Sequence, residues 1–564
     1  MTRRRLLALG LAGVMALSLA ACSTPASNDT TAAADTTAAA EGTEASGETG
    51  AAGGETSTGD KIFRYALTTD IATFDPNMSN ALADAQVIYH LYDGLYRNVS
   101  GDIQPAVATS YELSDDLLTY TFHLREDAYW SDGVQVTAND YEYGLKRLMD
   151  PATAAPGSYL GAVLANGSAV SSGEMSVDEL GVEALDDFTL QITLAYPADY
   201  FLGMLSMAAF MPVRQDIVEQ YGTEFATTPD KQVYNGPFVL TGFGSGEVTL
   251  AKNDTYWDSD SIKLDGIQVL TVADQNTQLN MFNNGELDYV ELSTDVAAQY
   301  EGQYEEYYNG SNDYAAFNHN NEYLANKNFR LAMNYALNRE EYIMLTHNGL
   351  YDANVRYVLP LVAGADGQTY GEEFPYEAFP VQGDQELAQQ YLATALEELG
   401  GISASDITLK LVVSDTDTAT REAEVVANQW ETNLGINIDI TMVPGATRNA
   451  MLVPNCADFD IIMTGWVPDY SDAYSYLELW IGNSGYNYLN YHSDEYDAYM
   501  EASQTTTGAE RQENLFNAEQ VLLEDAALAP LQLRKIQYMT AEGVTGLETY
   551  FVGLYFNCMY VDMQ

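Results

Sequence analysis

The sequence alternates regularly between helical and β-type patterns from residue 386 to residue 465, and this alternation constrains the fold more than any other feature. Apolar residues recur at helical spacing in 386–399 and 420–434, and each pattern ends in glycine, the usual residue just past a helix. Short apolar runs typical of strands lie at 407–413, 436–442 and 459–465. The order strand–helix–strand–helix–strand predicts a largely parallel sheet with helices on its faces.

Residues 61–313 have a different sequence pattern, in which short strand-like runs and turn residues occur without a repeated strand–helix unit. A strand is predicted at 62–67, a helix at 81–94, and a second helix that begins near Thr137 and runs to Leu148. The chain therefore predicts a mixed N-terminal part and a separate α/β part from about 314 to 535. Ligands of such two-lobed proteins bind in the crevice between the lobes.

The N-terminus has the pattern of an export signal. Three arginines are followed by an apolar run, residues 6–21, which is shorter than a membrane span of about 20 residues. The run ends at Cys22 in a sequence that resembles a bacterial lipobox, which implies that Cys22 is lipidated and that residues 1–21 are removed. Residues 22–60 are rich in Ala, Thr, Gly and acids, without a base or an aromatic residue, and predict a disordered tether.

The charge balance excludes several partners. The chain has 82 Asp and Glu against 23 Lys and Arg, a net charge of −59. Such an anionic surface repels phosphate backbones, so we expect no nucleic-acid binding, and it disfavours electrostatic attachment to anionic lipid. The 41 tyrosines suit a wet recognition surface, although tyrosine is also common in large α/β proteins.

Motifs for catalysis are missing from the sequence. There is no H-E-x-x-H, no G-x-S-x-G and no G-x-x-x-x-G-K-[ST], so we expect no enzymatic activity, no cofactor and no metal. Pairs of acids occur by chance among 82 such residues and do not by themselves predict a hydrolase. Cys456 and Cys558 could form one disulfide in an exported protein, but two buried thiols are the favoured interpretation.

Several motifs, in a fixed order, are similar to those of the extracellular solute-binding proteins of peptide and nickel ABC importers (family 5). They include Trp130-Ser-Asp-Gly133, Asn235-Gly-Pro-Phe238, Tyr256-Trp-Asp258 and Asn328-Phe-Arg-Leu-Ala. The resemblance covers residue 61 to the end. It implies a two-lobed periplasmic-binding-protein-like α/β fold with an extra N-terminal subdomain. Its implied division is a first-lobe core of 61–100, 233–313 and 536–564, a subdomain of 101–232, and a second lobe of 314–535.

Within this family the sequence is most similar to oligopeptide-binding proteins, because Gly465-Trp466-Val-Pro-Asp469-Tyr470 follows a predicted strand as their ligand loop does. The resemblance implies that Asp469 pairs with the α-ammonium of a peptide and that Trp466 forms a wall of the first side-chain pocket. It also places Gly465 at the ligand. The alternatives are that Asp469 caps a turn and that Trp466 is a core residue.

Two further positions depend on the same resemblance. Asn235 and Gly236 match a segment near the bound peptide, although a simple turn is an equal alternative. Met463 stands where some oligopeptide binders have an arginine that meets the ligand carboxylate, so the peptide C-terminus must be met by other groups or by water, and ligand length stays open.

The sequence thus predicts a monomeric, lipid-anchored binding protein on the outer face of the cytoplasmic membrane. It captures oligopeptides between two lobes and delivers them to the permease subunits of an ABC importer. Rival ligands are dipeptides, a nickel chelate, sugars or signalling peptides. A surface peptide hydrolase or a sensor is the rival from another class.

Overall fold

A computed structural model of the chain describes residues 61–99 and 101–564. The predicted signal peptide, Cys22 and the acidic tether lie outside the described residues, so these three features stay predictions. Among the described helices, none has the length and apolar character needed to cross a membrane.

The first lobe begins with a four-stranded sheet in the order β1 (Ile62–Leu67), β10 (Gly266–Thr271), β9 (Glu247–Lys252) and β8 (Phe238–Gly244). β1 is parallel to β10, and the other pairs are antiparallel. Alternate residues of β1 are buried, as its sequence pattern predicts. The helix α1 (Leu82–Leu91) contacts β8 and confirms the helix expected after the first turn.

A second four-stranded sheet, which is antiparallel, belongs to the same lobe. Its order is β4 (Ala108–Leu113), β5 (Thr119–Leu124), β7 (Thr189–Thr193) and β6 (Val182–Asp186). The predicted helix beginning at Thr137 is α2 (Ala138–Met149), and a capping box with Asp140 fixes its start. Trp130 is fully buried and donates a hydrogen bond to Asp140 over 3.2 Å, which explains the adjoining Trp-Ser-Asp-Gly motif as a structural turn.

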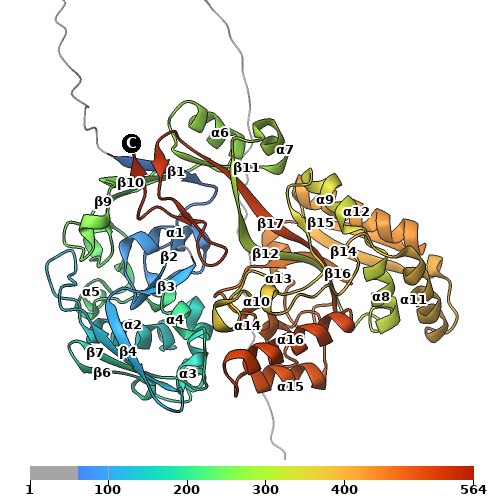
Figure 1. The fold of residues 1–564 in the computed structure, drawn as a ribbon, viewed down its shortest axis with the longest axis horizontal. Coiled ribbons are helices and arrows are strands. Elements are labelled where there is room, and N and C mark those ends of the chain that lie inside the picture. Colours follow the sequence, from blue (N-terminus) through green and yellow to red (C-terminus); the bar gives the residue numbers. More distant parts are fainter. Residues whose placement is uncertain (1–60, 100) are drawn as a thin grey trace, which may run out of the picture. The chain divides into compact units, whose positions relative to one another are not determined.

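A seven-stranded sheet forms the centre of the second lobe, although some of its strands come from residues before 314 or after 535 (Figure 1). Its order is β11 (Tyr289–Leu292), β17 (Leu528–Thr540), β12 (Glu305–Phe317), β16 (Ile461–Trp466), β14 (Thr408–Ser414) and β15 (Asn437–Val443), with β13 (Asp352–Ala353) beside β17. Only the pairs that β14 makes with β15 and β16 are parallel. The expectation of a largely parallel sheet is therefore right for these three strands and wrong for the other four.

Helices cover this sheet, and their apolar side chains form a buried core with those of its strands. They are α8 (Lys327–Tyr335), α9 (Arg339–His347), α11 (Gln385–Glu398) and α12 (Asp417–Leu434). Trp430 of α12 is fully buried in the apolar cluster that they share with β12 and β14. The predicted helix ends are confirmed, because Gly435 after α12 has a left-handed φ of 71°.

The last part of the chain connects the lobes. α15 (Asp494–Ser503) packs on α16 (Gly508–Glu524), and β17 follows. The chain then returns to the first lobe, where the ring of Phe556 lies 4.9 Å from that of Tyr65. Two short antiparallel strand pairs complete the first lobe. They are β18 (Val544–Thr545) with β21 (Asp562–Met563), and β19 (Glu548–Thr549) with β20 (Phe556–Asn557). Contacts do not divide the described residues further, so the predicted lobe boundaries stay a prediction.

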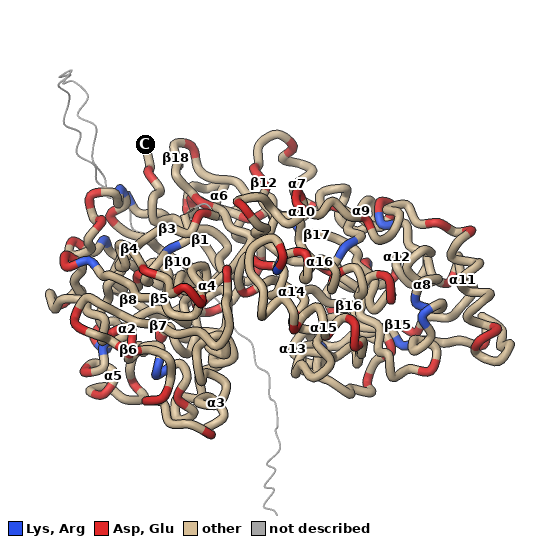
Figure 2. The backbone as a smooth tube through the Cα atoms, turned by 60° about the horizontal axis from the view of Figure 1, so that its bottom comes forward, with Lys and Arg blue, Asp and Glu red and all other residues tan. Residues whose placement is uncertain are grey.

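Acidic residues are spread over both lobes, and Lys and Arg are sparse (Figure 2). Most described bases pair with an acid at the surface or in the core. Two such pairs are buried: Arg356 with Glu519 over 2.5 Å, and Arg511 with Asp472 over 2.8 Å.

Candidate functional site

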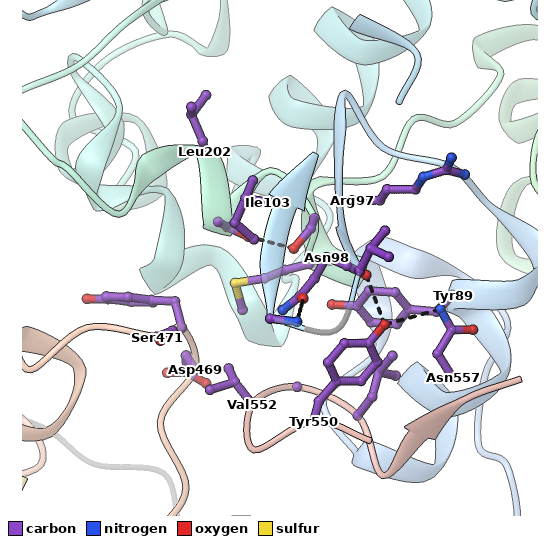
Figure 3. A pocket seen from close by; sticks show the side chains of 18 of the residues that line it. Tyr89, Arg97, Asn98, Ile103, Leu202, Asp469, Ser471, Tyr550, Val552 and Asn557 are labelled. Carbon is purple, nitrogen blue, oxygen red and sulfur yellow. Dashed lines mark hydrogen bonds between the residues drawn. The ribbon is translucent and has the colours of Figure 1, made fainter. Parts of the chain in front are cut away.

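Two neighbouring cavities lie where first-lobe elements face the segment that follows β16. One has a volume of about 280 Å³ and the other about 270 Å³. They share four lining residues, namely Tyr89, Met207, Asp469 and Gly553, and we call the two cavities together the cleft. Figure 3 shows the larger one, with Asp469 and Ser471 on one side and Ile103 and Leu202 on the other.

The loop after β16 holds Asp469 in this cleft. β16 ends at Trp466, and the chain turns into the short helix α14 (Tyr474–Leu477). The backbone N–H of Asp469 donates to Ser475 Oγ over 2.9 Å, and the indole N–H of Trp466 donates to the carbonyl of Ser475 over 2.8 Å. Ser475 is fully buried, so both ends of the loop are fixed to one rigid point.

The carboxylate of Asp469 meets the opposite lobe through a tyrosine. Tyr159 lies in a 3-10 helix, Pro156–Val163, and its hydroxyl donates to Asp469 Oδ2 over 3.1 Å. Close by, the ring of Tyr200 stacks on that of Tyr470 at 4.4 Å. These contacts join residues that are far apart in sequence and bring the two sides of the cleft together.

The electrostatics of the cleft favour a cation. Burial raises the pKa of Asp469 to about 6, and the hydrogen bond from Tyr159 offsets only part of that effect. Burial, and then repulsion from Asp469, raise the pKa of Glu478 to about 8. Neither acid has an ion pair with a described base. A positively charged group in the cleft would therefore find an acid whose desolvation the Tyr159 hydroxyl offsets only in part.

Trp466 lies near Asp469 but does not line either cavity of the cleft. Its ring is 5.9 Å from that of Tyr486, which in turn is 6.1 Å from the ring of Tyr159. Trp466 is half-buried against the core, so both earlier interpretations have a basis, and its ligand contact stays a prediction.

Asn235 and Gly236 lie behind the cleft surface. The Asn235 side chain accepts from the N–H of Asp93 over 3.1 Å and donates to the carbonyl of Asp93 over 2.9 Å. A Cβ on Gly236 would lie 2.6 Å from the backbone of Leu91 and Tyr92, so only glycine allows this approach. Both residues position Tyr92 and Asp93, which line the cleft, and their direct contact with a ligand stays a prediction.

Gly465 and Met463 line a third cavity, of about 360 Å³, inside the second lobe. A Cβ on Gly465 would lie 2.1 Å from Asp313 Oδ1, which explains why glycine occupies this strand position. Residues 463–465 and 467–471 therefore form consecutive walls of the third cavity and of the cleft.

The sequence did not indicate several cleft residues. Tyr159, Met207 and the segment around Gly553 come from loops and short helices without a periodic pattern. The high tyrosine content was the only available signal, and it does not distinguish cleft residues from core residues.

The described residues offer no activated nucleophile at the two cysteines. Cys558 and His90 are fully buried with Sγ and Nε2 3.2 Å apart, but burial raises the pKa of the thiol and lowers that of His90 to about 4. Both described cysteines are free thiols. The interpretation of two buried thiols is right for Cys558 and wrong for Cys456, which is only half-buried beside the surface loop before β16.

Two lobes on separate sheets, with a cleft between them, define a ligand-binding protein of the two-lobed periplasmic type. The model of the bacterial extracellular solute-binding proteins, family 5, matches residues 102–488, which is more than half of the chain. The chain belongs to this family, and the resemblance seen in its motifs is confirmed.

Individual relatives extend the match to nearly the whole chain. Oligopeptide-binding protein OppA of Bacillus subtilis is 29% identical over 89% of this chain and 94% of its own. Dipeptide-binding protein DppE of the same organism is 29% identical over 90% and 92%. The structure of Listeria monocytogenes OppA bound to peptide has 30% identity and a TM-score of 0.74, and covers 90% of this chain and 99% of its own.

Proposed function

We propose that this chain is the lipid-anchored substrate-binding protein of an ABC importer and that it captures oligopeptides in the cleft. The observation that carries the proposal is Asp469, a desolvated carboxylate in the cleft without a basic partner among the described residues. An α-ammonium is present on every unmodified peptide, so pairing with Asp469 provides affinity that does not depend on side chains.

Lobe closure is part of the proposal. The proposed boundaries between residues 313 and 314 and between 535 and 536 fall inside β12 and β17, which pair with each other. Their register shifts between Tyr308 and Asn312, where Gly310 has a φ of 79°. Bending at this irregular point would let the second lobe, 314–535, close on the first. The ligand shifts the balance only through contacts that it makes in the closed state.

Titration calorimetry with a free tripeptide and its N-acetyl form tests whether Asp469 pairs with the peptide α-ammonium. We expect the wild type to bind the free peptide well and the acetylated one poorly. Asp469→Ala should weaken the free peptide by about 2–5 kcal/mol, or roughly 30-fold and more, and should add little to the penalty of acetylation. Equal affinity for the two peptides in the wild type would contradict the pairing of Asp469 with the α-ammonium.

The dipeptide-binding relative is as similar as the oligopeptide-binding one, so a dipeptide is the second candidate ligand. A thermal-shift series over peptides of two to eight residues separates the two. A nickel chelate, a sugar and a signalling peptide belong in the same panel, and sustained release of amino acids from a bound peptide would favour a hydrolase instead.

A further inference from the structure

Two consecutive residues of the first lobe, Asp199 and Tyr200, contact the second lobe directly. They stand just before the short helix α4 (Phe201–Met204), in the proposed subdomain 101–232. In Figure 1, α4 lies next to α14 and below β12 and β17. The residues that Asp199 and Tyr200 contact, all in the proposed second lobe, are Tyr470, Tyr474, Gly508 and Arg511.

The ring of Tyr200 packs against aromatic and cationic groups of the second lobe. It is 8% exposed, and it stacks on the ring of Tyr470 at 4.4 Å and 12° and on that of Tyr474 at 6.2 Å and 14°. The guanidinium of Arg511 lies 5.1 Å from the centre of the same ring, within the range at which an aromatic face attracts a cation. Stacked rings contribute more than their buried area alone. Separation of the lobes would therefore cost Tyr200 all of these contacts.

Asp199 caps a helix of the opposite lobe. Its Oδ2 accepts the backbone N–H of Gly508, the first residue of α16, over 2.8 Å. Within the described part of the chain, the helix's own N-cap residue, Thr507, makes no side-chain hydrogen bond to the helix. A carboxylate at this end satisfies a free N–H and interacts favourably with the helix dipole. The first lobe thus supplies a cap that the second lobe lacks.

Both contacts reach the loop that carries Asp469. Tyr470 is the next residue in that loop, and Arg511 of α16 pairs with Asp472 of the same loop over 2.8 Å. Asp199, Tyr200 and Tyr470 also line the larger cavity of the cleft. The contacts between the lobes therefore form part of the wall around the space next to Asp469.

We propose that Asp199 and Tyr200, together with the second-lobe residues that they contact, form a latch that holds the lobes closed and sets how long a peptide stays bound. The proposal rests on the proposed function, because it assumes that the lobes close on a peptide by bending near Gly310. Opening has to break the latch whatever the peptide sequence is. Asp199 and Tyr200 are thus positioning residues, which hold the Asp469 loop against the first lobe.

The test measures the association and dissociation rates of a free tripeptide by stopped-flow fluorescence. The variants are Tyr200→Ala and Asp199→Ala, each with a conservative partner, Tyr200→Phe and Asp199→Asn. Tyr129→Ala is the matched control, because Tyr129 belongs to the same subdomain and lines neither cavity of the cleft.

We expect Tyr200→Ala to raise the dissociation rate roughly tenfold without slowing association, because opening no longer breaks the stacked and cationic contacts. Asp199→Ala should raise it by roughly two- to fivefold through loss of the cap. Tyr200→Phe keeps the ring and Asp199→Asn keeps an acceptor for the Gly508 N–H, so both should stay near the wild-type rate. Tyr129→Ala should not change it.

The affinity ratio between the free and the N-acetylated tripeptide distinguishes the latch from a direct ligand contact. Both Ala variants should keep the wild-type ratio, whereas Asp469→Ala should lose it. Melting temperatures without ligand check that each variant folds. If Tyr200→Ala does not fold, Asp199→Ala decides the test, because Asp199 is exposed.

The outcomes separate the two proposals. If no peptide binds the wild type, the proposed function fails. If peptides bind and both Ala variants release them at the wild-type rate, peptide capture stands and the latch is wrong. A changed ratio between the free and the acetylated peptide in Tyr200→Ala would also overturn the latch, because this tyrosine would then act on the ligand itself.

Discussion

At the residue scale, the shifted pKa of Asp469 makes ligand binding depend on pH. The pKa of about 6 lies above the usual value of 3.8, so the folded protein keeps this proton while the unfolded chain loses it. The contribution of Asp469 to the free energy of unfolding therefore falls as pH rises from about 4 to 6. Above this range the folded protein holds an ionised, desolvated carboxylate. An α-ammonium, whose pKa is about 8, stays charged throughout this window and can offset that loss.

We expect the affinity for a free-amine peptide to rise about tenfold between pH 5 and pH 7, following the ionisation of Asp469. Calorimetry at several pH values measures this rise. Asp469→Asn should give a flat profile, and Glu478→Gln should keep the rise because the Glu478 carboxyl, with a pKa of about 8, stays protonated in this range. A flat wild-type profile would contradict the assignment.

Gly465 makes a second residue-scale prediction. A Cβ there would displace the carboxylate of Asp313, which accepts from Ser311 Oγ and Gln532 Nε2, each over 2.8 Å, and pairs with Arg534. We expect Gly465→Ala to lower the free energy of unfolding by about 1–3 kcal/mol in urea titrations.

Gly485→Ala is the control for this change, since a Cβ on Gly485 meets nothing within 4 Å. Equal stability of the two variants would show that Asp313 moves aside without cost.

Sequence and structure agree unevenly at this scale. The motif after β16 predicted Asp469 as a ligand residue, because its residues are adjacent in the chain; the structure places Asp469 in the cleft, and its ligand contact stays a prediction. Its partner Tyr159 is 310 positions away, and no local pattern connects them.

At the element scale, the repeated pattern from 386 to 465 predicted β14, β15, β16 and their helices well, because each is a local apolar run closed by a turn. The sequence pattern predicted no bounds for β12 or β17, and the reason is physical. Both contain buried polar residues, such as Asn312 and Gln532, whose partners lie on other elements and interrupt the alternation that reveals a strand. These two strands make the sheet mixed.

One buried ion pair connects α16 to the loop that carries Asp469. Arg511 and Asp472 form two hydrogen bonds of 2.8 Å, and their side chains are 1% and 3% exposed. Arg511→Met leaves Asp472 as an uncompensated buried charge, so we expect a loss of about 3–5 kcal/mol in the free energy of unfolding.

Adding Asp472→Asn to Arg511→Met should recover a large part of this loss, because it removes the orphaned charge and keeps a hydrogen-bond acceptor. A double-mutant cycle from urea titrations gives the coupling. Additive losses would mean that the two residues act independently and that α16 supports the loop through apolar contacts alone.

At the scale of the whole molecule, the net charge of −59 acts on the ligand before it reaches the cleft. Acidic residues are spread over both lobes (Figure 2), and Asp469, which is mostly ionised at neutral pH, adds a negative charge in the cleft. The field of such a surface attracts cations over about a Debye length, which is about 30 Å at 0.01 M salt and about 8 Å at 0.15 M.

A lysine-containing tripeptide should therefore associate faster than a neutral one, and stopped-flow fluorescence of the cleft aromatics can follow both. We expect its association rate to fall by about tenfold between 0.01 M and 0.15 M salt, while the dissociation rate changes little, because screening acts on the approach and hardly on a desolvated contact. The neutral peptide is the control and should show a small change. If both peptides respond equally to salt, the surface charge does not steer ligands, and selection of the peptide occurs only after it has entered the cleft.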